Sequence, residues 1–251
     1  MAVCVTDFVQ GTLMLIGLLV VPLVAYFLLP GNLTDLITQS GVTGGANAYL
    51  NPFINGDRPY TPIEIISNLA WGLGYCGMPH VLVRFMAVRS EKELKKSWVI
   101  AIIWDLLSLT AAFAIAVIGR AYLLPTILGE NGAASSESVF IEMIRKVFTS
   151  QLALPFIGGL FLCGILAAIM STADSQLLVT ASAVSEDLYH NFIKKDADSK
   201  EILRVSRITV IVIAIIAFAI AWDPNSSIMG LVSNAWAGLG AAFGPIVVMS
   251  L

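Results

Sequence analysis

Long apolar stretches separated by short polar segments dominate the chain, and most approach the length that crosses a lipid bilayer. A membrane-spanning helix needs about 20 predominantly apolar residues. We expect a helix in each of six stretches: 8–29, 62–88, 98–118, 152–184, 208–222 and 228–251. The stretch at 152–184 is long enough to tilt or to extend beyond the bilayer. The pattern therefore predicts an all-α integral membrane protein with about six transmembrane helices.

The polar segments between these stretches differ in kind. Residues 30–61 hold Gly, Asn, Thr and Pro with few charges, whereas residues 139–148 form an amphipathic stretch that predicts a short outer helix. The Asp-Pro-Asn-Ser run at 223–226 predicts a tight turn.

We expect residues 1–251 to form a single transmembrane domain that is incomplete at both ends. The chain begins almost directly at a predicted span, and the last apolar stretch ends without a polar flank or basic anchor. These features favour a piece of a longer membrane protein over a naturally short six-span protein.

One predicted span, residues 62–88, is interrupted. Three glycines and a proline fall within positions 72–79, and glycine weakens a helix by about 1 kcal/mol and proline by about 3 kcal/mol. Broken helices at membrane depth line substrate sites in secondary transporters, although a structural proline kink is the alternative. If the helix persists there, Trp71 and Tyr75 share a face that suits a small amphipathic solute.

A second predicted span carries polar side chains in an otherwise apolar helix. Residues 164–176 read Gly-Ile-Leu-Ala-Ala-Ile-Met-Ser-Thr-Ala-Asp-Ser-Gln, so Ala168, Ser171 and Thr172 share one helix face. Two hydroxyl oxygens suit a hard cation such as sodium, although hydroxyls also bond back to helix carbonyls or join helices. Asp174 points away from this face, so a structural hydrogen bond competes with ion coupling as its role.

Composition supports the membrane assignment and narrows the chemistry. The chain is 57% hydrophobic and 12% charged, whereas soluble domains carry roughly 25% charged residues. Its three cysteines and two histidines have no spacing typical of a disulfide framework or a zinc site. A membrane-embedded enzyme is therefore the least favoured class, and we expect no nucleic-acid partner.

The basic residues orient the predicted spans. If the helices alternate, ten of the 14 Lys and Arg residues fall on one side, in the segments that follow the second and fourth spans. The positive-inside rule places that side in the cytoplasm. The amino terminus is then cytoplasmic, and the segments at 30–61 and 123–150 lie outside.

Several runs resemble the sodium/proline symporters of the sodium/solute symporter family. They are Trp-Gly-Leu-Gly-Tyr-Cys-Gly-Met-Pro-His at 71–80, Ile-Leu-Ala-Ala-Ile-Met-Ser-Thr at 165–172, the Gly-rich run at 230–245 and Thr-Asp-Phe-Val-Gln at 6–10. The resemblance covers nearly the whole chain. It implies the inverted-repeat fold shared with sodium-coupled leucine transporters. In that fold, the first predicted helix of this chain would end repeat one, and the other five would form repeat two.

The same resemblance implies the site residues and the coupling ion. The sodium ligands would be the Ala168 carbonyl and the Ser171 and Thr172 hydroxyls, completed by a broken helix from the rest of the transporter. Asp7 matches an acidic position implicated in sodium coupling. The residues implied to contact proline are Trp71, Tyr75 and Pro79.

The leading hypothesis is a sodium-coupled secondary active symporter that imports L-proline by alternating access and is not an enzyme. Its partners would be the substrate, Na+, the lipid bilayer and the remainder of the same polypeptide, in a bacterial-type inner membrane. The alternatives are a sodium symporter for another small amino or organic acid, an ion channel, and a sodium sensor. A channel is disfavoured because no symmetric repeat of charges or carbonyls is visible.

Overall fold

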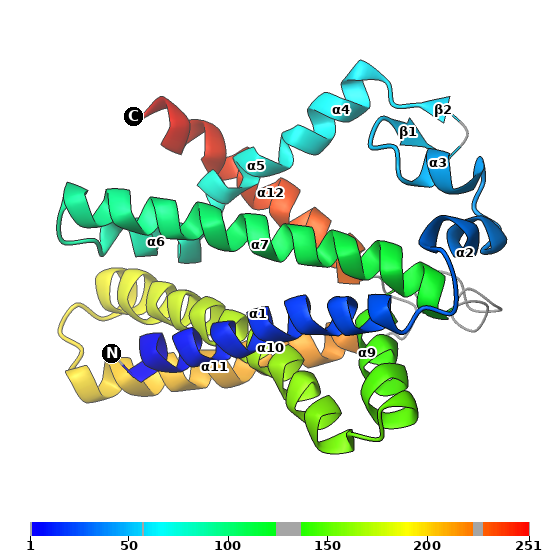
Figure 1. Ribbon diagram of the computed structural model, residues 1–251. Coiled ribbons are helices and arrows are strands. Elements are labelled where there is room, and N and C mark those ends of the chain that lie inside the picture. The colour runs from blue at the N-terminus through cyan, green and yellow to red at the C-terminus, as the bar shows by residue number, and fades with distance from the viewer. Residues whose placement is uncertain (1, 57, 124–136, 223–227, 251) are drawn as a thin grey trace. The chain divides into compact units, whose positions relative to one another are not determined.

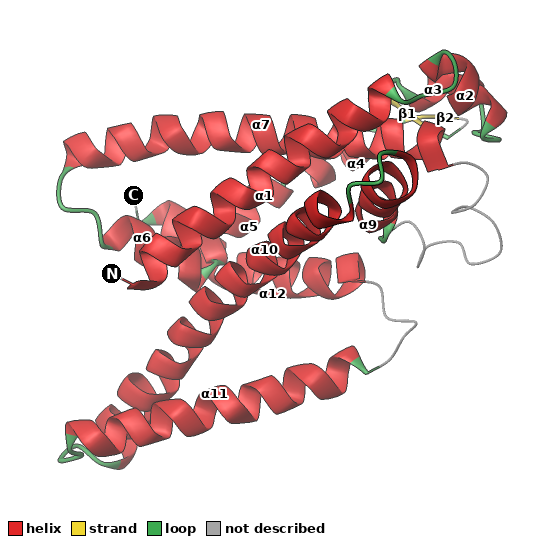
Figure 2. Ribbon diagram, turned by 60° about the horizontal axis from the view of Figure 1, so that its bottom comes forward, coloured by secondary structure: helices red, strands yellow, loops and turns green. Residues whose placement is uncertain are grey.

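The computed structural model describes residues 2–56, 58–123, 137–222 and 228–250, and most of them are helical (Figures 1 and 2). Besides the α-helices, these described residues form one 3₁₀ segment, η1, and two π-helical segments, η2 and η3. The elements are α1 (Ala2–Phe27), α2 (Leu33–Gln39), α3 (Gly45–Tyr49), β1 (Ile54–Asn55), β2 (Arg58–Pro59), α4 (Pro62–Leu69), α5 (Trp71–Gly74), η1 (Tyr75–Gly77), α6 (Pro79–Met86), α7 (Glu91–Leu123), α9 (Val139–Ile144), η2 (Arg145–Gln151), α10 (Pro155–Ser182), η3 (Ala183–Ile193), α11 (Ser199–Ala221) and α12 (Ile228–Met249).

Five helices in the described part of the chain are long and apolar enough to cross a membrane. They confirm the all-α membrane class and five of the six predicted spans. The fourth predicted span continues through η3 to Ile193 instead of ending near residue 184. The segment after residue 184 is polar, so it extends the helix without extending the apolar stretch that gave the prediction.

The predicted span at 62–88 is divided into α4, α5, η1 and α6, which confirms its interruption. The Thr61 side chain and Glu64 form a capping box that starts α4, with Pro62 in the first turn. The second break lies at Met78, whose extended backbone precedes Pro79 at the start of α6. No piece alone is long enough to span a bilayer, so the crossing of the membrane by this stretch stays a prediction.

Two of the polar segments carry more structure than their composition predicts. The helix expected at 139–148 is present as α9, but it continues as η2 to Gln151 in π-helical form. Residues 30–61, expected as a plain loop, contain α2, α3 and a small hairpin in which Ile54 pairs with Pro59. The turn predicted at 223–226 lies outside the described residues.

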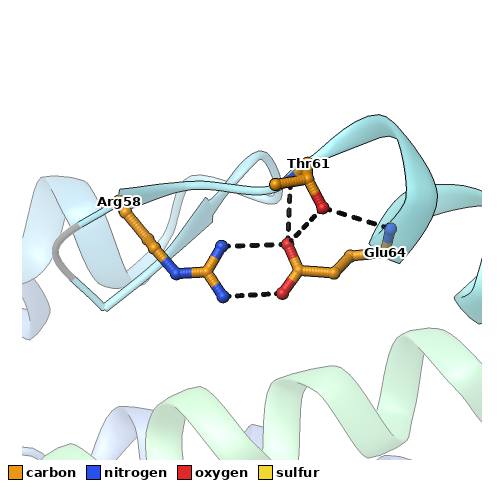
Figure 3. A network of polar contacts seen from close by, with 3 residues as sticks. All are labelled: Arg58, Thr61 and Glu64. Carbon is orange, nitrogen blue, oxygen red and sulfur yellow. Dashed lines mark hydrogen bonds and ion pairs between the residues drawn. The ribbon is translucent and has the colours of Figure 1, made fainter.

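The hairpin is tied to α4 by one ion pair (Figure 3). Arg58 Nη2 and Nη1 donate to the two carboxylate oxygens of Glu64 at 2.6 and 3.0 Å, and the backbone N–H of Thr61 donates to Glu64 Oε2 at 2.8 Å. These bonds lie outside the five candidate spans. The hydrogen bond from Arg58, followed by those from Thr61, lowers the pKa of Glu64 to about 2.

The chain divides into two compact units, and each is described by itself. The larger unit consists of residues 4–72 and 88–168, and its core joins α1, α7, α9, η2 and the first part of α10. Its centre is fully buried at Val21, Met143, Ile144 and Val147. Small residues allow this packing: a Cβ on Gly17 of α1 would come within 3.2 Å of the ring of Phe161 in α10.

The smaller unit consists of residues 1–3, 73–87 and 169–251. In it α12 lies against η1, and α11 turns back beside η3 to form a helical hairpin (Figure 2). Glu201 closes the hairpin, because it accepts hydrogen bonds from the Tyr189 hydroxyl at 2.7 Å and from Lys194 Nζ at 2.7 and 2.9 Å. The Glu201 carboxylate raises the pKa of Lys194 through the hydrogen bond and its charge. The single domain expected over residues 1–251 stays a prediction.

Candidate functional site

The three residues of the predicted sodium site lie on one uninterrupted helix, α10. Ala168, Ser171 and Thr172 therefore keep the spacing that places them on one face. Ala168 and Ser171 are half-buried and Thr172 is exposed. A helical carbonyl retains a second lone pair after accepting its N–H, so this face offers one carbonyl and two hydroxyl oxygens within about one turn.

This set of neutral oxygens suits a monovalent hard cation. Within the described ranges, no cluster of three His, Cys, Asp or Glu side chains is arranged to hold a metal ion. A transition-metal site therefore has no support in that part of the chain.

A third hydroxyl, that of Ser175 one turn along α10, connects this face to α6. Ser175 Oγ donates to the Ser171 carbonyl at 3.0 Å and accepts a hydrogen bond from Arg84 Nη2 at 2.9 Å. All three residues belong to the smaller unit. The sequence contained part of this signal, since Ser175 follows Ser171 by four positions, but the Arg84 contact required the fold.

Asp174 is exposed on α10, as Thr172 is. Two positions along an α-helix correspond to a rotation of about 200° from Thr172. Its role in ion coupling or in hydrogen bonding stays a prediction.

Each residue of the predicted proline site begins a different short segment of the broken helix. Trp71 starts α5, Tyr75 starts η1 and Pro79 starts α6. Trp71 is half-buried, whereas Tyr75 and Pro79 are exposed. The α-helical register ends at Gly74, so the face that a continuous helix would give to Trp71 and Tyr75 does not follow from helix periodicity.

The glycines of the broken helix serve close packing against α12. A Cβ on Gly74 would overlap the indole of Trp236, and a Cβ on Gly77 would overlap the Leu239 carbonyl. Gly240 of α12 is equally close to this segment, because a Cβ added to Gly240 would lie 2.9 Å from the Gly74 Cα atom. Helix packing therefore explains two of the glycines that the sequence analysis assigned to a ligand-facing backbone.

Trp236 of α12 is an aromatic neighbour of the candidate site. Its ring meets that of Tyr75 edge to face, with centroids 4.5 Å apart and planes at 87°. Tyr75 remains 50% exposed, so the pair leaves part of the phenol ring open.

Asp7 lies half-buried on α1, one turn before Gln10. The Gln10 Oε1 atom is buried and has no hydrogen-bond partner among the described residues. A Cβ on Gly11 would come within 3.4 Å of the Trp104 ring of α7, so this turn of α1 faces another helix. Polar groups thus gather at the start of α1, and the coupling role of Asp7 stays a prediction.

Comparisons with known proteins agree on one family. The model of the sodium:solute symporter family matches residues 1–251. The chain is 43% identical over 251 residues to the osmoregulated proline transporter OpuE of Bacillus subtilis, and 42% identical over 254 residues to sodium/proline symporter 2 of Staphylococcus saprophyticus. It is 40% identical over 254 residues to the high-affinity proline transporter PutP of Bacillus subtilis.

These alignments cover all of this chain but only 48%, 47% and 50% of the three relatives, in that order. The chain thus spans about half the length of the curated relatives that it matches. No solved structure matches the chain.

Proposed function

Because the chain belongs to the sodium:solute symporter family, we propose that it forms part of a sodium-coupled secondary active transporter that imports L-proline. The names of its relatives support proline as the substrate. The observation that carries the proposal is the face of α10 with Ala168, Ser171 and Thr172 in one unbroken helix. The remainder of the transporter, in its inverted-repeat fold, supplies the other half of each site.

Sodium binds to oxygen atoms of α10 in this proposal. The Ala168 carbonyl and the Ser171 and Thr172 hydroxyls act as ligands, because a hard cation prefers oxygen. The hydrogen bond from Ser175 fixes the Ser171 carbonyl, and Arg84 fixes the Ser175 hydroxyl. A change in the α10 backbone at this level is thereby transmitted to α6.

Proline binds where the broken helix exposes aromatic surface. Tyr75, packed against Trp236, presents an apolar ring and a hydroxyl to the substrate. Trp71 and Pro79 contribute apolar surface from the segments on either side of Tyr75. An apolar wall with a few polar groups suits a small amino acid.

Coupling follows from the link between the two elements that bind. α6 begins at Pro79 of the proline site and contacts α10 through Arg84 and Ser175, one turn from the sodium ligand Ser171. Sodium and proline each stabilise one arrangement of α6 and α10. By linkage, each ligand then raises the affinity for the other by the same factor.

The test is proline uptake by the full-length polypeptide that carries this chain, reconstituted in liposomes. We expect uptake that saturates and depends on a sodium gradient. Replacement of both hydroxyls, Ser171→Ala with Thr172→Ala, should weaken sodium activation at least tenfold, which corresponds to about 1.4 kcal/mol.

The matched control is Thr180→Ala, which removes a hydroxyl from the same helix. Thr180 Oγ1 donates back to the Gln176 carbonyl at 2.8 Å, so it has a structural role. Sodium activation should remain as in the wild type. Unchanged sodium affinity in the double variant would show that the assigned ligands are wrong, and sodium-driven uptake of a different solute in place of proline would revise the substrate.

A further inference from the structure

The larger unit contains a pocket that shares no residue with the proposed sodium or proline sites. Its volume is about 400 Å³, and its walls come from the residues that follow α1, from α2, from the end of α7 and from η2. Pockets that bind small molecules have volumes of about 300–1,000 Å³. The residues that decide its chemistry are Leu28, Leu36, Gln39, Tyr122, Lys146 and Gln151.

Lys146 brings a half-buried positive charge to this pocket. Its Nζ donates to the Tyr122 carbonyl at 2.7 Å and lies 4.7 Å from the centroid of the Tyr122 ring. No Asp or Glu side chain lies within ion-pair distance of Lys146 among the described residues. A carbonyl and a ring face stabilise the ammonium, and no carboxylate in the described part of the chain compensates its charge.

Two amides add further donors beside this charge. The Tyr122 hydroxyl donates to Gln151 Oε1 at 2.6 Å, which occupies the amide oxygen and leaves the Gln151 amide N–H groups as donors. Gln39 contributes a second amide from the last residue of α2. The polar side of the pocket therefore combines an ammonium with amide donors, whereas Leu28 and Leu36 make an apolar side.

The π-helical form of η2 is what brings Lys146 and Gln151 to one pocket. In an α-helix, residues five apart are rotated by about 140° relative to each other. In η2 the hydrogen bonds run between residues five apart, as from the Leu152 N–H to the Val147 carbonyl at 3.0 Å, so such residues stack on the same side. π-Helical segments are rare in proteins, and those that occur are often found at functional sites. A role for η2 in forming a binding pocket agrees with this tendency.

We propose that this pocket binds a small carboxylate that carries an apolar body. The carboxylate accepts charge-assisted hydrogen bonds from Lys146 and from the Gln151 amide, and the apolar body contacts Leu28 and Leu36. The pocket lies at the membrane face that the distribution of basic residues places outside. The ligand is therefore taken from the outer solution, either as an amino acid or as a carboxylate without an amine.

The experiment uses the full-length polypeptide in lipid nanodiscs and cyclopentanecarboxylate labelled with ¹³C at the carboxyl, followed by NMR titration without sodium. We expect saturable binding that Lys146→Met weakens at least tenfold and Lys146→Arg largely retains. The matched control is Lys92→Met, an exposed lysine near the start of α7, which should leave binding unchanged.

Tyr122→Phe is a second variant that keeps the ring under Lys146 and removes only the hydroxyl that orients Gln151. We expect it to weaken binding severalfold, and it tests the pocket if Lys146→Met does not fold. Competition by L-proline identifies an amino acid as the ligand, and lack of competition identifies a carboxylate without an amine.

An absence of saturable binding to the wild type, or equal binding by the wild type and a folded Lys146→Met protein, would overturn the proposal. The readout is binding without sodium, so a failure here is distinguishable from a failure of sodium-driven uptake. Loss of uptake in the Ser171 and Thr172 variant leaves this result untouched.

Discussion

Glu64 illustrates how strongly one exposed neighbour acts on a carboxyl group that lies outside the five candidate spans. Arg58 reaches both of its oxygens, and Thr61 adds a backbone and a hydroxyl hydrogen bond to Oε2 (Figure 3). The same carboxylate therefore caps α4 and fastens the hairpin. Because the folded-state pKa lies below the usual value, this network stabilises the fold above the unfolded pKa and is lost as pH falls toward about 2.

Arg58→Gln should raise the pKa of Glu64 toward its ordinary value, because the largest cause of the shift is removed. The Thr61 hydrogen bonds remain, so the return should be incomplete. Titration of the Glu64 side-chain carboxyl by ¹³C NMR measures the shift, with Arg89→Gln as the control for loss of one exposed arginine. An unchanged midpoint would contradict the assigned ion pair.

At the level of elements, the contact between η1 and α12 depends on the absence of side chains. Gly74→Ala or Gly77→Ala would force a methyl group into Trp236 or into the Leu239 carbonyl. Overpacking of this kind costs about 1–3 kcal/mol. We expect a lower melting temperature for either variant of the full-length protein in detergent.

The control for this prediction lies two residues before Gly74. Gly72 is in the same short helix, and a Cβ there meets nothing within 4 Å. Gly72→Ala should be neutral or slightly stabilising, since alanine favours a helix over glycine by about 1 kcal/mol. If all three alanine variants melted alike, the close crossing would not exist as described.

Elements with one dominant period could be predicted from the sequence, and those set by packing could not. Ser171 and Thr172 needed only a continuous helix, and the interruption at 72–79 needed only the intrinsic cost of glycine and proline. The pairing of Trp236 with Tyr75 depends on which helix crosses η1. The placement of Lys146 and Gln151 at one pocket depends on the π-helical register of η2, which no simple residue pattern predicts.

At the scale of the whole molecule, the unequal distribution of lysine and arginine predicts which segments lie on each side of the membrane. Cysteine at position 145 on η2 should react with an impermeant maleimide added outside, and cysteine at position 195 should react only from inside. Both positions are exposed, so access to the thiol does not limit the reaction. The native cysteines must first be replaced, so that only the introduced cysteine reacts. Labelling of both positions from one side would contradict the predicted alternation of the membrane spans.

The helical hairpin of η3 and α11, which Glu201 closes, bears on how the chain enters the membrane during synthesis. Its partners Lys194 and Tyr189 are only 7 and 12 residues away in sequence, so the loop-closure entropy is small. η3 and α11 can therefore pair as soon as both have left the ribosome, before α12 is made. Glu201→Gln should therefore slow the pairing of η3 with α11 during translation. Its effect on the stability of the finished protein should be smaller.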